Sequence, residues 1–155
     1  MDAIDLAIVG VLVDDARTTF AEIAQRVGLS SPSTGERVRK LEERGVIRGY
    51  HADLDPEAAG LGLTAFVAVT LASPEFRAGF LEGIGHMSRI VECHHVAGDD
   101  DFLLKVHVAG TRGLEAFVTD GVKSLPGVAR TRTTVVLSTQ LARPLSPPPA
   151  ETPSQ

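Results

Sequence analysis

The sequence predicts an α+β fold: an N-terminal helix-turn-helix domain, winged-helix-like, followed by a ferredoxin-like βαββαβ domain. Up to Gly49 the apolar residues recur at helical spacing, whereas after Asp55 they alternate along short β-branched runs. The second part also repeats itself after a shift of 37 residues. We expect a helix-turn-helix domain at 1–50, a linker at 51–62, the ferredoxin-like domain at 63–141 and a disordered tail at 142–155.

The composition is that of a folded soluble protein. The 155 residues are 43% hydrophobic and 23% charged, which is ordinary for a globular chain. The longest apolar run, 6–13, is too short to cross a bilayer and lacks the basic flank of a signal peptide. We therefore expect a cytoplasmic protein with no membrane partner. The single cysteine, Cys93, excludes an internal disulfide and a thiolate-rich zinc site.

The first two helices are defined by their apolar spacing and their ends. The first carries an apolar stripe and ends before the acidic pair at 14–15. The members of this stripe are Ile4, Ile8, Val11 and Leu12. Thr19 and Glu22 have the spacing of a capping box at the start of the second helix. That helix ends at Gly28, a residue suited to the left-handed backbone after a helix.

A third helix follows directly and completes a helix-turn-helix. Ser30 or Ser31 is its N-cap, Pro32 lies in its first turn, and Gly45 ends it. A short helix, a glycine-containing turn and a second helix form the arrangement in which the second helix can enter a DNA major groove.

The exposed side of the third helix carries hydroxyl and cationic groups. Val38 and Leu41 face the core, and the opposite stripe consists of Ser33, Arg37, Lys40 and Arg44. Between residues 17 and 50, seven basic side chains against four acidic ones give +3, which leaves −8 elsewhere in a chain of net charge −5. Such groups favour contacts with phosphates and base edges of double-stranded DNA. The alternative is a solvated helix whose cations pair with Glu36, Glu42 and Glu43.

The second half reads as strand, helix, strand, strand, helix, strand. The strands are expected at 63–72, 90–97, 102–109 and 128–137, and the helices at 74–87 and 112–125. The repeat superposes Val67 on Leu104 and Phe80 on Phe117, as two strand-helix-strand units require. Helices cover one face of such a sheet, so Leu103 points to the uncovered face. A dimer that packs sheet against sheet would cover that face.

Two segments have residue types that also suit a metal. Asp99, Asp100 and Asp101 follow Gly98 in a bend between two strands, but no further oxygen ligands are evident. In 93-CHH-95, Cys93 and His95 share a strand face and would need a third ligand, so a small thiol and a sheet histidine are the preferred interpretation. We expect no metal site and no cofactor, since nucleophile, phosphate-loop and dinucleotide motifs are missing.

From Asp2 to about Leu141 the sequence resembles the Lrp/AsnC family, the leucine-responsive or feast/famine transcription regulators of bacteria and archaea. The segments that carry the resemblance are 2-DAIDLAI-8, 14-DDAR-17, 22-EIAQRVGLS-30, 36-ERVRKLEERGVIRGYHADLDP-56 with the following Gly60, 98-GDDDFLLKV-106, 126-PGV-128 and 131-TRTTVVL-137. Each segment is weak alone, and their order and spacing are specific.

The resemblance implies a sequence-specific transcription regulator rather than an enzyme. It implies a linking strand at about residues 47–53, a second domain for effector binding and oligomerisation, and homodimers that often assemble to octamers. A small effector, an amino acid in many members, alters assembly or DNA affinity. Carried over, the DNA-facing residues are Ser31, Ser33, Thr34, Arg37, Arg39 and Lys40. The effector-facing residues are Ala97, Gly98, Asp99, Asp100, Asp101 and Thr134.

Three features depart from the family pattern. Ser31 with Pro32 shifts the usual position of the proline by one residue, which affects the contacts expected near the start of the third helix. Gly35 stands where the family usually has a larger residue, and an interior glycine weakens a helix by about 1 kcal/mol relative to alanine. Asp100 stands where the family usually has an aromatic residue. Its charge either favours a basic or polar amino acid or means that no amino acid binds well.

An enzyme of the same architecture is the alternative function. Some proteins that resemble this family decarboxylate a tetrapyrrole, and they would use histidine and arginine in the second domain. The available side chains are His94, His95, His107, Arg130 and Arg132. The cationic stripe on the third helix argues against this alternative, because such an enzyme has no use for it.

Overall fold

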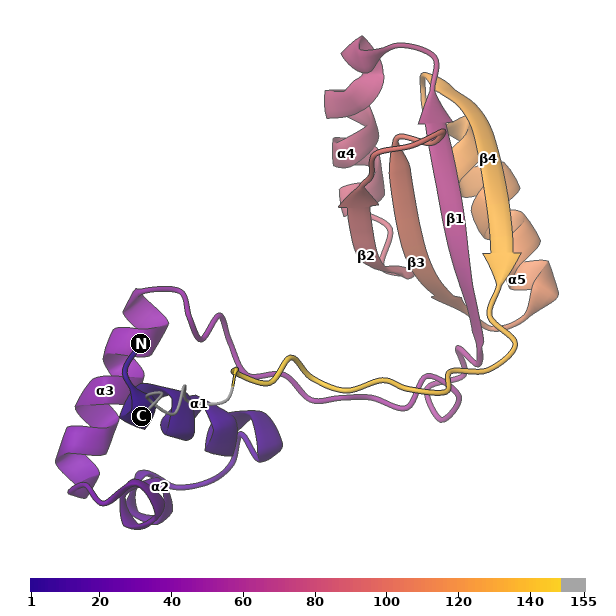
Figure 1. The fold of residues 1–155 in the computed structure, drawn as a ribbon. Coiled ribbons are helices and arrows are strands. Elements are labelled where there is room, and N and C mark those ends of the chain that lie inside the picture. Colours follow the sequence, from indigo (N-terminus) through magenta and orange to yellow (C-terminus); the bar gives the residue numbers. More distant parts are fainter. Residues whose placement is uncertain (149–155) are drawn as a thin grey trace, which may run out of the picture. The chain divides into compact units, whose positions relative to one another are not determined.

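The computed structural model describes residues 1–148 and divides into two compact units. Of the described residues, the first unit contains Met1–Ala52 together with residues 141–148, and the second contains Asp53–Gln140. Helices alone form the first unit, and a four-stranded sheet with helical segments forms the second (Figure 1). Each unit encloses its own cluster of buried apolar side chains, so each is stabilised by a hydrophobic core of its own.

The first unit contains helices α1 (Ala3–Asp14), α2 (Phe20–Val27) and α3 (Ser31–Glu43). Each predicted helix is therefore present, and α1 ends at Asp14, one residue later than expected. The core is formed by one apolar stripe from each helix. Its buried members are Ile8, Leu12, Ile23, Val38 and Leu41. The helix-turn-helix is confirmed, and residues 1–52 contain no β-hairpin wing.

The linking segment after α3 differs from the prediction. Residues 47–53 form no strand, because no other strand lies beside them to pair with their backbone. Residues 56–60 form turns instead, closed by the Leu61 N–H donating to the Pro56 carbonyl at 2.7 Å. Residues 141–148 contain no helix or strand, and the rest of the tail that we predicted to be disordered lies outside the described residues.

The second unit has the predicted βαββαβ order. Its antiparallel sheet contains β1 (Leu63–Leu71), β2 (Ile90–His95), β3 (Phe102–Val108) and β4 (Val128–Val135) in the order β2-β3-β1-β4. A 3-10 turn (Pro74–Phe76) and α4 (Arg77–Gly85) follow β1. After β3, α5 (Thr111–Ala116) continues as a π-helical turn (Phe117–Gly121) and a 3-10 turn (Val122–Ser124).

The helical segment predicted at 112–125 is present, as three consecutive helical segments of different type. The hydrogen-bonding pattern changes where Val118 and Thr119, both β-branched, precede Gly121, and these residue types lower the stability of a regular α-helix. The remaining elements agree with the prediction to within two residues at most ends.

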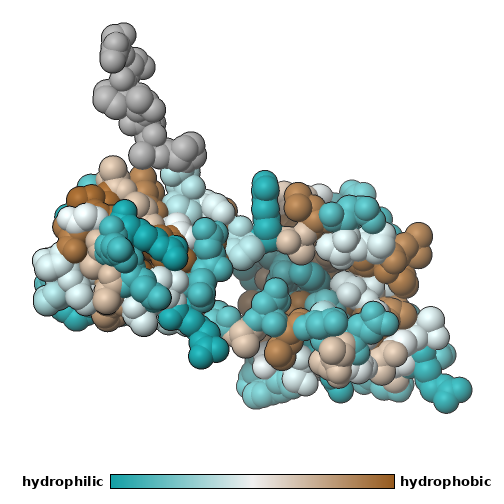
Figure 2. Space-filling model, turned by 90° about the horizontal axis from the view of Figure 1, so that it is seen from below, coloured by the Kyte–Doolittle hydropathy of each residue, from teal (hydrophilic) through white to brown (hydrophobic). Residues whose placement is uncertain are grey.

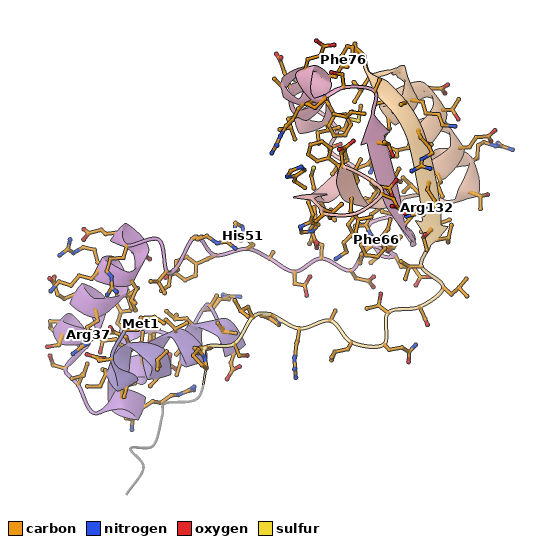
Figure 3. All side chains as sticks on the ribbon, turned by 45° about the horizontal axis from the view of Figure 1, so that its top comes forward. Met1, Arg37, His51, Phe66, Phe76 and Arg132 are labelled. Carbon is orange, nitrogen blue, oxygen red and sulfur yellow. The ribbon has the colours of Figure 1, made fainter. Side chains whose placement is uncertain are left out.

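The sheet has one covered face and one open face. Along β3, Phe102, Leu104, Val106 and Val108 are buried against the helices, while Leu103, Lys105 and His107 alternate with them on the open face and are only half-buried. The prediction for Leu103 is confirmed. Val67 pairs with Leu104 across β1 and β3, so equivalent positions of the internal repeat meet at the centre of the sheet. Phe66, labelled in Figure 3, pairs with Lys105 and belongs to the open face.

Apolar side chains also remain at the surface of both units. The exposed ones include Phe20, Tyr50, Leu81, Val91 and Leu137. In Figure 2 hydrophobic patches alternate with hydrophilic ones on the visible face of each unit. Within the described residues, no helix has the length and apolar content needed to cross a membrane.

Candidate nucleic-acid interface and effector bend

Local signals in the sequence orient α3. The Thr19 hydroxyl accepts the Glu22 N–H and the Glu22 carboxylate accepts the Thr19 N–H, which closes the predicted capping box of α2. Gly28 then adopts φ 71°, the left-handed conformation that ends α2. Ser30 is the N-cap of α3, and its hydroxyl accepts the Ser33 N–H at 3.3 Å. The turn between the two helices is therefore three residues long, and α3 starts as a helix-turn-helix requires.

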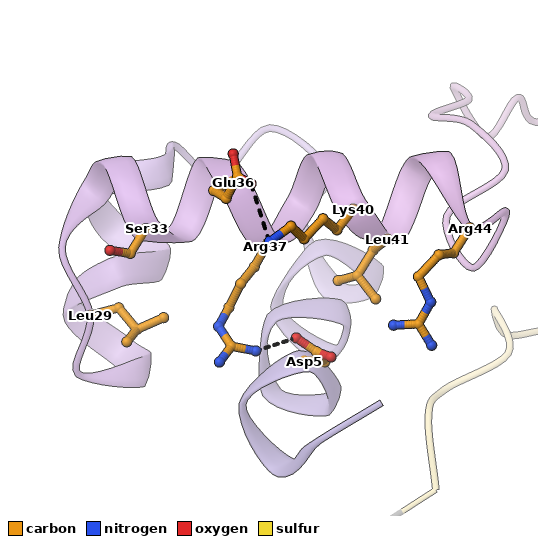
Figure 4. Close-up of a pocket in the computed structure, with 8 residues that line it drawn as sticks. All are labelled: Asp5, Leu29, Ser33, Glu36, Arg37, Lys40, Leu41 and Arg44. Carbon is orange, nitrogen blue, oxygen red and sulfur yellow. Dashed lines mark hydrogen bonds and ion pairs between the residues drawn. The ribbon is translucent and has the colours of Figure 1, made fainter.

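The face of α3 that points away from the core carries the predicted stripe. Ser33, Arg37, Lys40 and Arg44 line one depression of about 470 Å³ together with Asp5, Leu29, Glu36 and Leu41 (Figure 4). Ser31, Ser33, Arg39 and Lys40 are exposed. The prediction that Thr34 faces DNA is wrong. This residue is fully buried, and its hydroxyl donates to the Ser30 carbonyl at 3.1 Å. Its side chain therefore belongs to the core and cannot face DNA.

Arg37 is bound within the domain. Its Nη1 donates to Asp2 at 2.8 Å and to Asp5 at 2.7 Å, and these two aspartates also close the capping box at the start of α1. The Asp5 side chain is 12% exposed and that of Arg37 is 32% exposed. The Asp5 backbone N–H, followed by Arg37, lowers the pKa of Asp2, and the two carboxylates raise the pKa of Arg37. Arg37 therefore links α3 to the first turn of α1 through these two ion pairs.

The other cations of α3 form only surface pairs. Arg39 binds Glu36 and Glu43, and Lys40 lies 3.2 Å from Glu36. Arg39, followed by Lys40, lowers the pKa of Glu36. Exposed pairs of this kind contribute little to stability, so a phosphate can replace the glutamate. In the part of the chain that the structure describes, Arg44 makes no ion pair. The alternative interpretation, a solvated helix, is thus correct that Glu36 and Glu43 pair with cations of α3. These pairs leave Arg39 and Lys40 exposed.

The C-terminal end of α3 holds the start of the linking segment. The Tyr50 hydroxyl donates to Glu42 at 2.9 Å. Burial, followed by this carboxylate, raises the pKa of Tyr50 to about 12. The segment that leaves the first unit is therefore attached to the recognition helix by a side-chain hydrogen bond.

The three aspartates of the bend between β2 and β3 have different environments. The Asp100 side chain is 8% exposed and accepts from Thr70 at 3.0 Å, Arg132 at 2.7 Å and Arg130 at 3.4 Å. The Asp101 carboxylate accepts the Leu71 N–H at 2.7 Å. Asp99 is exposed; its backbone carbonyl accepts from Arg130 at 3.3 Å, and its carboxylate has no hydrogen bond or ion pair within residues 1–148. Two of the three carboxylates are thus internal bonding partners.

The remaining residues of the predicted effector set are near the bend or farther along the sheet. Ala97 and Gly98 are exposed in the bend itself. Thr134 pairs with Phe66, two residues beyond Arg132 on β4, and its side chain makes no hydrogen bond to the bend within residues 1–148. Figure 3 labels Arg132 on β4. The prediction of the effector set did not include Arg130 and Arg132, although their alternation with Thr134 placed them on the same strand face.

Three of the five histidines contact other side chains of the second unit. His94 pairs with Glu92 at 2.9 Å, His107 with Thr64 at 3.0 Å, and His95 stacks on Phe102. Lys105, followed by His94, lowers the pKa of Glu92. Cys93 is exposed, and partial burial raises the pKa of its thiol. No group of three or more potential metal ligands is found in residues 1–148.

A helix-turn-helix with a cationic recognition helix, joined to a ferredoxin-like domain, defines the class of two-domain DNA-binding regulators. Two family models match this chain: the AsnC-type helix-turn-helix domain over residues 1–42 and the Lrp/AsnC ligand binding domain over residues 64–145. The chain therefore belongs to the Lrp/AsnC family and is a DNA-binding transcriptional regulator.

Individual relatives agree over nearly the whole chain. The transcriptional regulator LrpA of Mycobacterium tuberculosis is 40% identical over 139 residues, which are 90% of this chain and 91% of the relative. The leucine-responsive regulatory protein of Escherichia coli is 39% identical over 139 residues, 88% of this chain and 85% of its own. These relatives are transcriptional regulators and give no support to the tetrapyrrole decarboxylase alternative.

Two similar solved structures contain an amino acid. A transcriptional regulator of Neisseria meningitidis in complex with L-methionine has a TM-score of 0.89 and 30% identity, and the match covers 96% of each chain. A feast or famine regulatory protein of M. tuberculosis complexed with L-methionine has a TM-score of 0.88 and 38% identity, covering 95% of this chain and 99% of the other.

Proposed function

We propose that this regulator binds DNA through the exposed face of α3 and that an amino acid bound at the bend changes this binding. The observation that carries the proposal is the exposed row of Ser33, Lys40 and Arg44 on the second helix of a helix-turn-helix. Because its target is chromosomal DNA, the protein would act in the cytoplasm of a bacterial or archaeal cell.

Within this surface we assign two roles. Ser31, Ser33, Arg39, Lys40 and Arg44 contact phosphates and base edges, because their side chains are exposed. Arg37 is a positioning residue, since its guanidinium binds Asp2 and Asp5 and so sets how α3 lies on α1. Two such helices in a dimer would reach half-sites about 34 Å apart on one side of the duplex.

Salt-dependent DNA binding tests the α3 surface. Labelled duplex from the region upstream of the protein's own coding sequence is titrated, with fluorescence anisotropy as the readout. Lys40→Ala and Arg44→Ala should each weaken binding to all sequences and reduce the slope of log affinity against log salt by about 1. Lys123→Ala, an exposed lysine of the second unit, is the matched control. An unchanged slope in both α3 variants would contradict the assignment.

We further propose that the open face of the sheet mediates homodimers, which assemble further, up to octamers. Phe66, Ala68 and Leu103 form an apolar centre on this face, and no helix of the second unit covers it. Leu103→Glu should yield monomers by size-exclusion chromatography with light scattering. Leu81→Glu, at an exposed leucine on α4, is the control. A Leu103→Glu variant that stays dimeric would exclude this face.

The amino-acid part of the proposal is supported by the two relatives that hold L-methionine and by the accessible bend at Ala97–Asp99. Thermal unfolding and DNA affinity are measured with each of the twenty amino acids. We expect one or a few of them to raise the melting temperature and change DNA affinity. If none of the twenty amino acids changes the melting temperature or the DNA affinity, the bend is a structural turn and not an effector site.

A further inference from the structure

The segment directly after α3 is held against the end of that helix. The Val46 and Ile47 N–H groups both donate to the Leu41 carbonyl, at 2.9 and 3.2 Å. The Ile47 side chain is half-buried and packs on the core of the first unit. Residues 46 and 47 are therefore fixed to α3 by backbone hydrogen bonds and by an apolar contact.

A second attachment lies three residues farther along the chain. The Tyr50 hydroxyl donates to Glu42, in the last turn of α3, at 2.9 Å. Between the two attachments Gly49 has a φ of 156°, which residues with a side chain rarely adopt, and a Cβ there would lie 3.1 Å from the His51 ring. This glycine lets the chain bend so that Tyr50 reaches Glu42.

Arg48 lies between the two attachments, and its side chain is exposed. Within residues 1–148 no hydrogen bond or ion pair engages its guanidinium group. A guanidinium has five N–H donors and retains its charge at all physiological pH values. A cation whose backbone is fixed on both sides and whose donors are all available suits a phosphate oxygen.

Arg48 also lies close to the cations of the recognition helix. Arg44 is the C-cap of α3 and lines the same depression as Lys40 (Figure 4). Four residues of chain span at most about 14 Å, and the segment is bonded to Leu41 and Glu42, so Arg48 stays near the end of α3. A DNA strand carries one phosphate for about each 3.4 Å of its axis, so one duplex can meet both arginines.

We infer that Arg48 binds a backbone phosphate of the duplex beside the groove that α3 enters, and that Ile47 and Tyr50 are positioning residues that hold it there. This inference rests on the proposed DNA-binding function and adds a contact outside the recognition helix. Residues 1–52 contain no β-hairpin wing. The linking segment, attached at both sides of Arg48, supplies the second contact instead.

A structural role at the end of α3 is the competing interpretation. Cations are favourable near the C-terminus of a helix, and Arg44 at the C-cap already provides one there. The two roles differ in a measurable way. A phosphate contact releases a counterion from DNA and changes the salt dependence of binding, whereas support of the helix end changes only the stability of the first unit.

The test measures the DNA affinity of the full-length protein across a salt series by fluorescence anisotropy. The probes are the duplex from upstream of the protein's own coding sequence and a shuffled duplex of the same length and composition. Arg48→Gln should reduce the slope of log affinity against log salt by about 1 on both duplexes, because a phosphate contact carries no sequence information. Arg48→Lys retains the charge and should retain the slope.

Arg112→Gln is the matched control, because Arg112 is an exposed arginine of the second unit that makes no ion pair within the described residues. It should leave both affinity and slope unchanged. Circular dichroism melting of every variant reports separately on the stability of the fold.

Tyr50→Phe tests the positioning role, because it retains the ring and removes only the hydrogen bond to Glu42. It should weaken DNA binding about threefold in the presence of Arg48 and have no further effect in the Arg48→Gln background. An equal loss in both backgrounds would show that Tyr50 does not act through Arg48.

The outcomes separate this inference from the proposed function. If Lys40→Ala and Arg44→Ala reduce the salt slope and Arg48→Gln does not, the inference is wrong and the α3 surface stands. If none of the three variants changes the slope, both are wrong. If Arg48→Gln lowers the melting temperature and leaves the slope unchanged, Arg48 supports the end of α3 and does not contact DNA.

Discussion

Both domains bury a carboxylate beneath arginine, but in opposite proportions. In the N-terminal domain one arginine, Arg37, serves two carboxylates, and its side chain is 32% exposed. In the C-terminal domain two arginines serve one carboxylate, Asp100, and remain 61% and 67% exposed. The proportion decides what is left for a ligand. Internal ion pairs occupy the arginine of the first cluster and the carboxylate of the second cluster.

The largest expected effect comes from removing both arginines of the second cluster. The double variant Arg130→Gln/Arg132→Gln removes both ion pairs of the buried Asp100 carboxylate. Within the described chain, only the hydrogen bond from the Thr70 hydroxyl then remains. An uncompensated buried charge is costly, so the second domain should lose about 3 kcal/mol of unfolding free energy. Urea unfolding followed by circular dichroism measures the loss.

Asp100→Asn is the comparison for this double variant. It leaves two exposed arginines that water can solvate, so it should cost less, about 1 kcal/mol. Equal costs for the two variants would mean that Asp100 is not the group whose burial matters.

The first cluster should show a smaller effect. Asp5→Ala removes a buried acceptor and half of the capping box, and Arg37, a third exposed, then remains with Asp2. We expect the N-terminal domain to lose about 2 kcal/mol, with hydrogen exchange read separately in α1 and in the sheet. Asp14→Ala, an exposed residue at the end of α1, is the control. Faster exchange in the sheet instead would contradict a role confined to the first domain.

Acid should weaken the N-terminal domain more than the C-terminal one. Asp2, Glu22 and Glu36 have pKa values below their ordinary 3.8 to 4.5 because hydrogen bonds and cations stabilise their charged forms. In the second domain Glu92 is the carboxyl with a pKa lowered in this way. A lowered pKa in the folded state gives stability that is present above the unfolded value and is lost as pH falls through the folded value.

The decline should therefore begin near pH 4.5 and continue below 3.8. Hydrogen exchange of the two domains across this range measures it. Glu36→Gln should flatten the decline in the first domain and Glu92→Gln in the second. If the second domain loses stability more steeply than the first as pH falls, the expected order of acid sensitivity is wrong.

The smallest effect is a stabilising one. A Cβ on Gly35 would lie 3.4 Å from the Phe20 ring, an ordinary contact, and alanine removes the conformational cost of glycine inside a helix. Gly35→Ala should raise the stability of the N-terminal domain by up to about 1 kcal/mol and leave the second domain unchanged. Gly127→Ala is the opposite case, because its Cβ would lie 2.0 Å from Phe76 at a φ of 81°. Thermal unfolding distinguishes the two.

Short-range patterns predicted most of the fold. The capping box at Thr19 and Glu22, the glycine at Gly28 and the alternation in β3 each depend on residues a few positions apart, and each is present in the structure. The helical segment predicted at 112–125 is present, but apolar spacing could not show the change of helical type at Phe117–Gly121. The linking strand at about 47–53, which the family resemblance implied, is not present in this chain, because a strand needs a neighbouring strand to pair with.

The candidate sites were less predictable because their chemistry depends on distant partners. The spacing put Arg37 on the outer face of α3, but the carboxylates that bind it are 32 and 35 residues away. Asp100 was predicted to face an effector, and its bonding partners lie 30 and 32 residues away on β1 and β4. Thr34 was placed with the polar residues by type, whereas its position one helical turn before Val38 puts it in the core.

The bond between Tyr50 and Glu42 has a spectroscopic consequence. Tyr50 is the only tyrosine and the chain has no tryptophan, so near-ultraviolet absorption above the phenylalanine bands comes from this one ring. While the phenol is held by α3 its pKa is about 12, and once detached it returns toward 10. Between these values the phenolate absorbance measures the fraction of molecules in which the linking segment has separated from the recognition helix. The protein thus contains its own optical reporter, without any label, of the contact between the linking segment and the recognition helix.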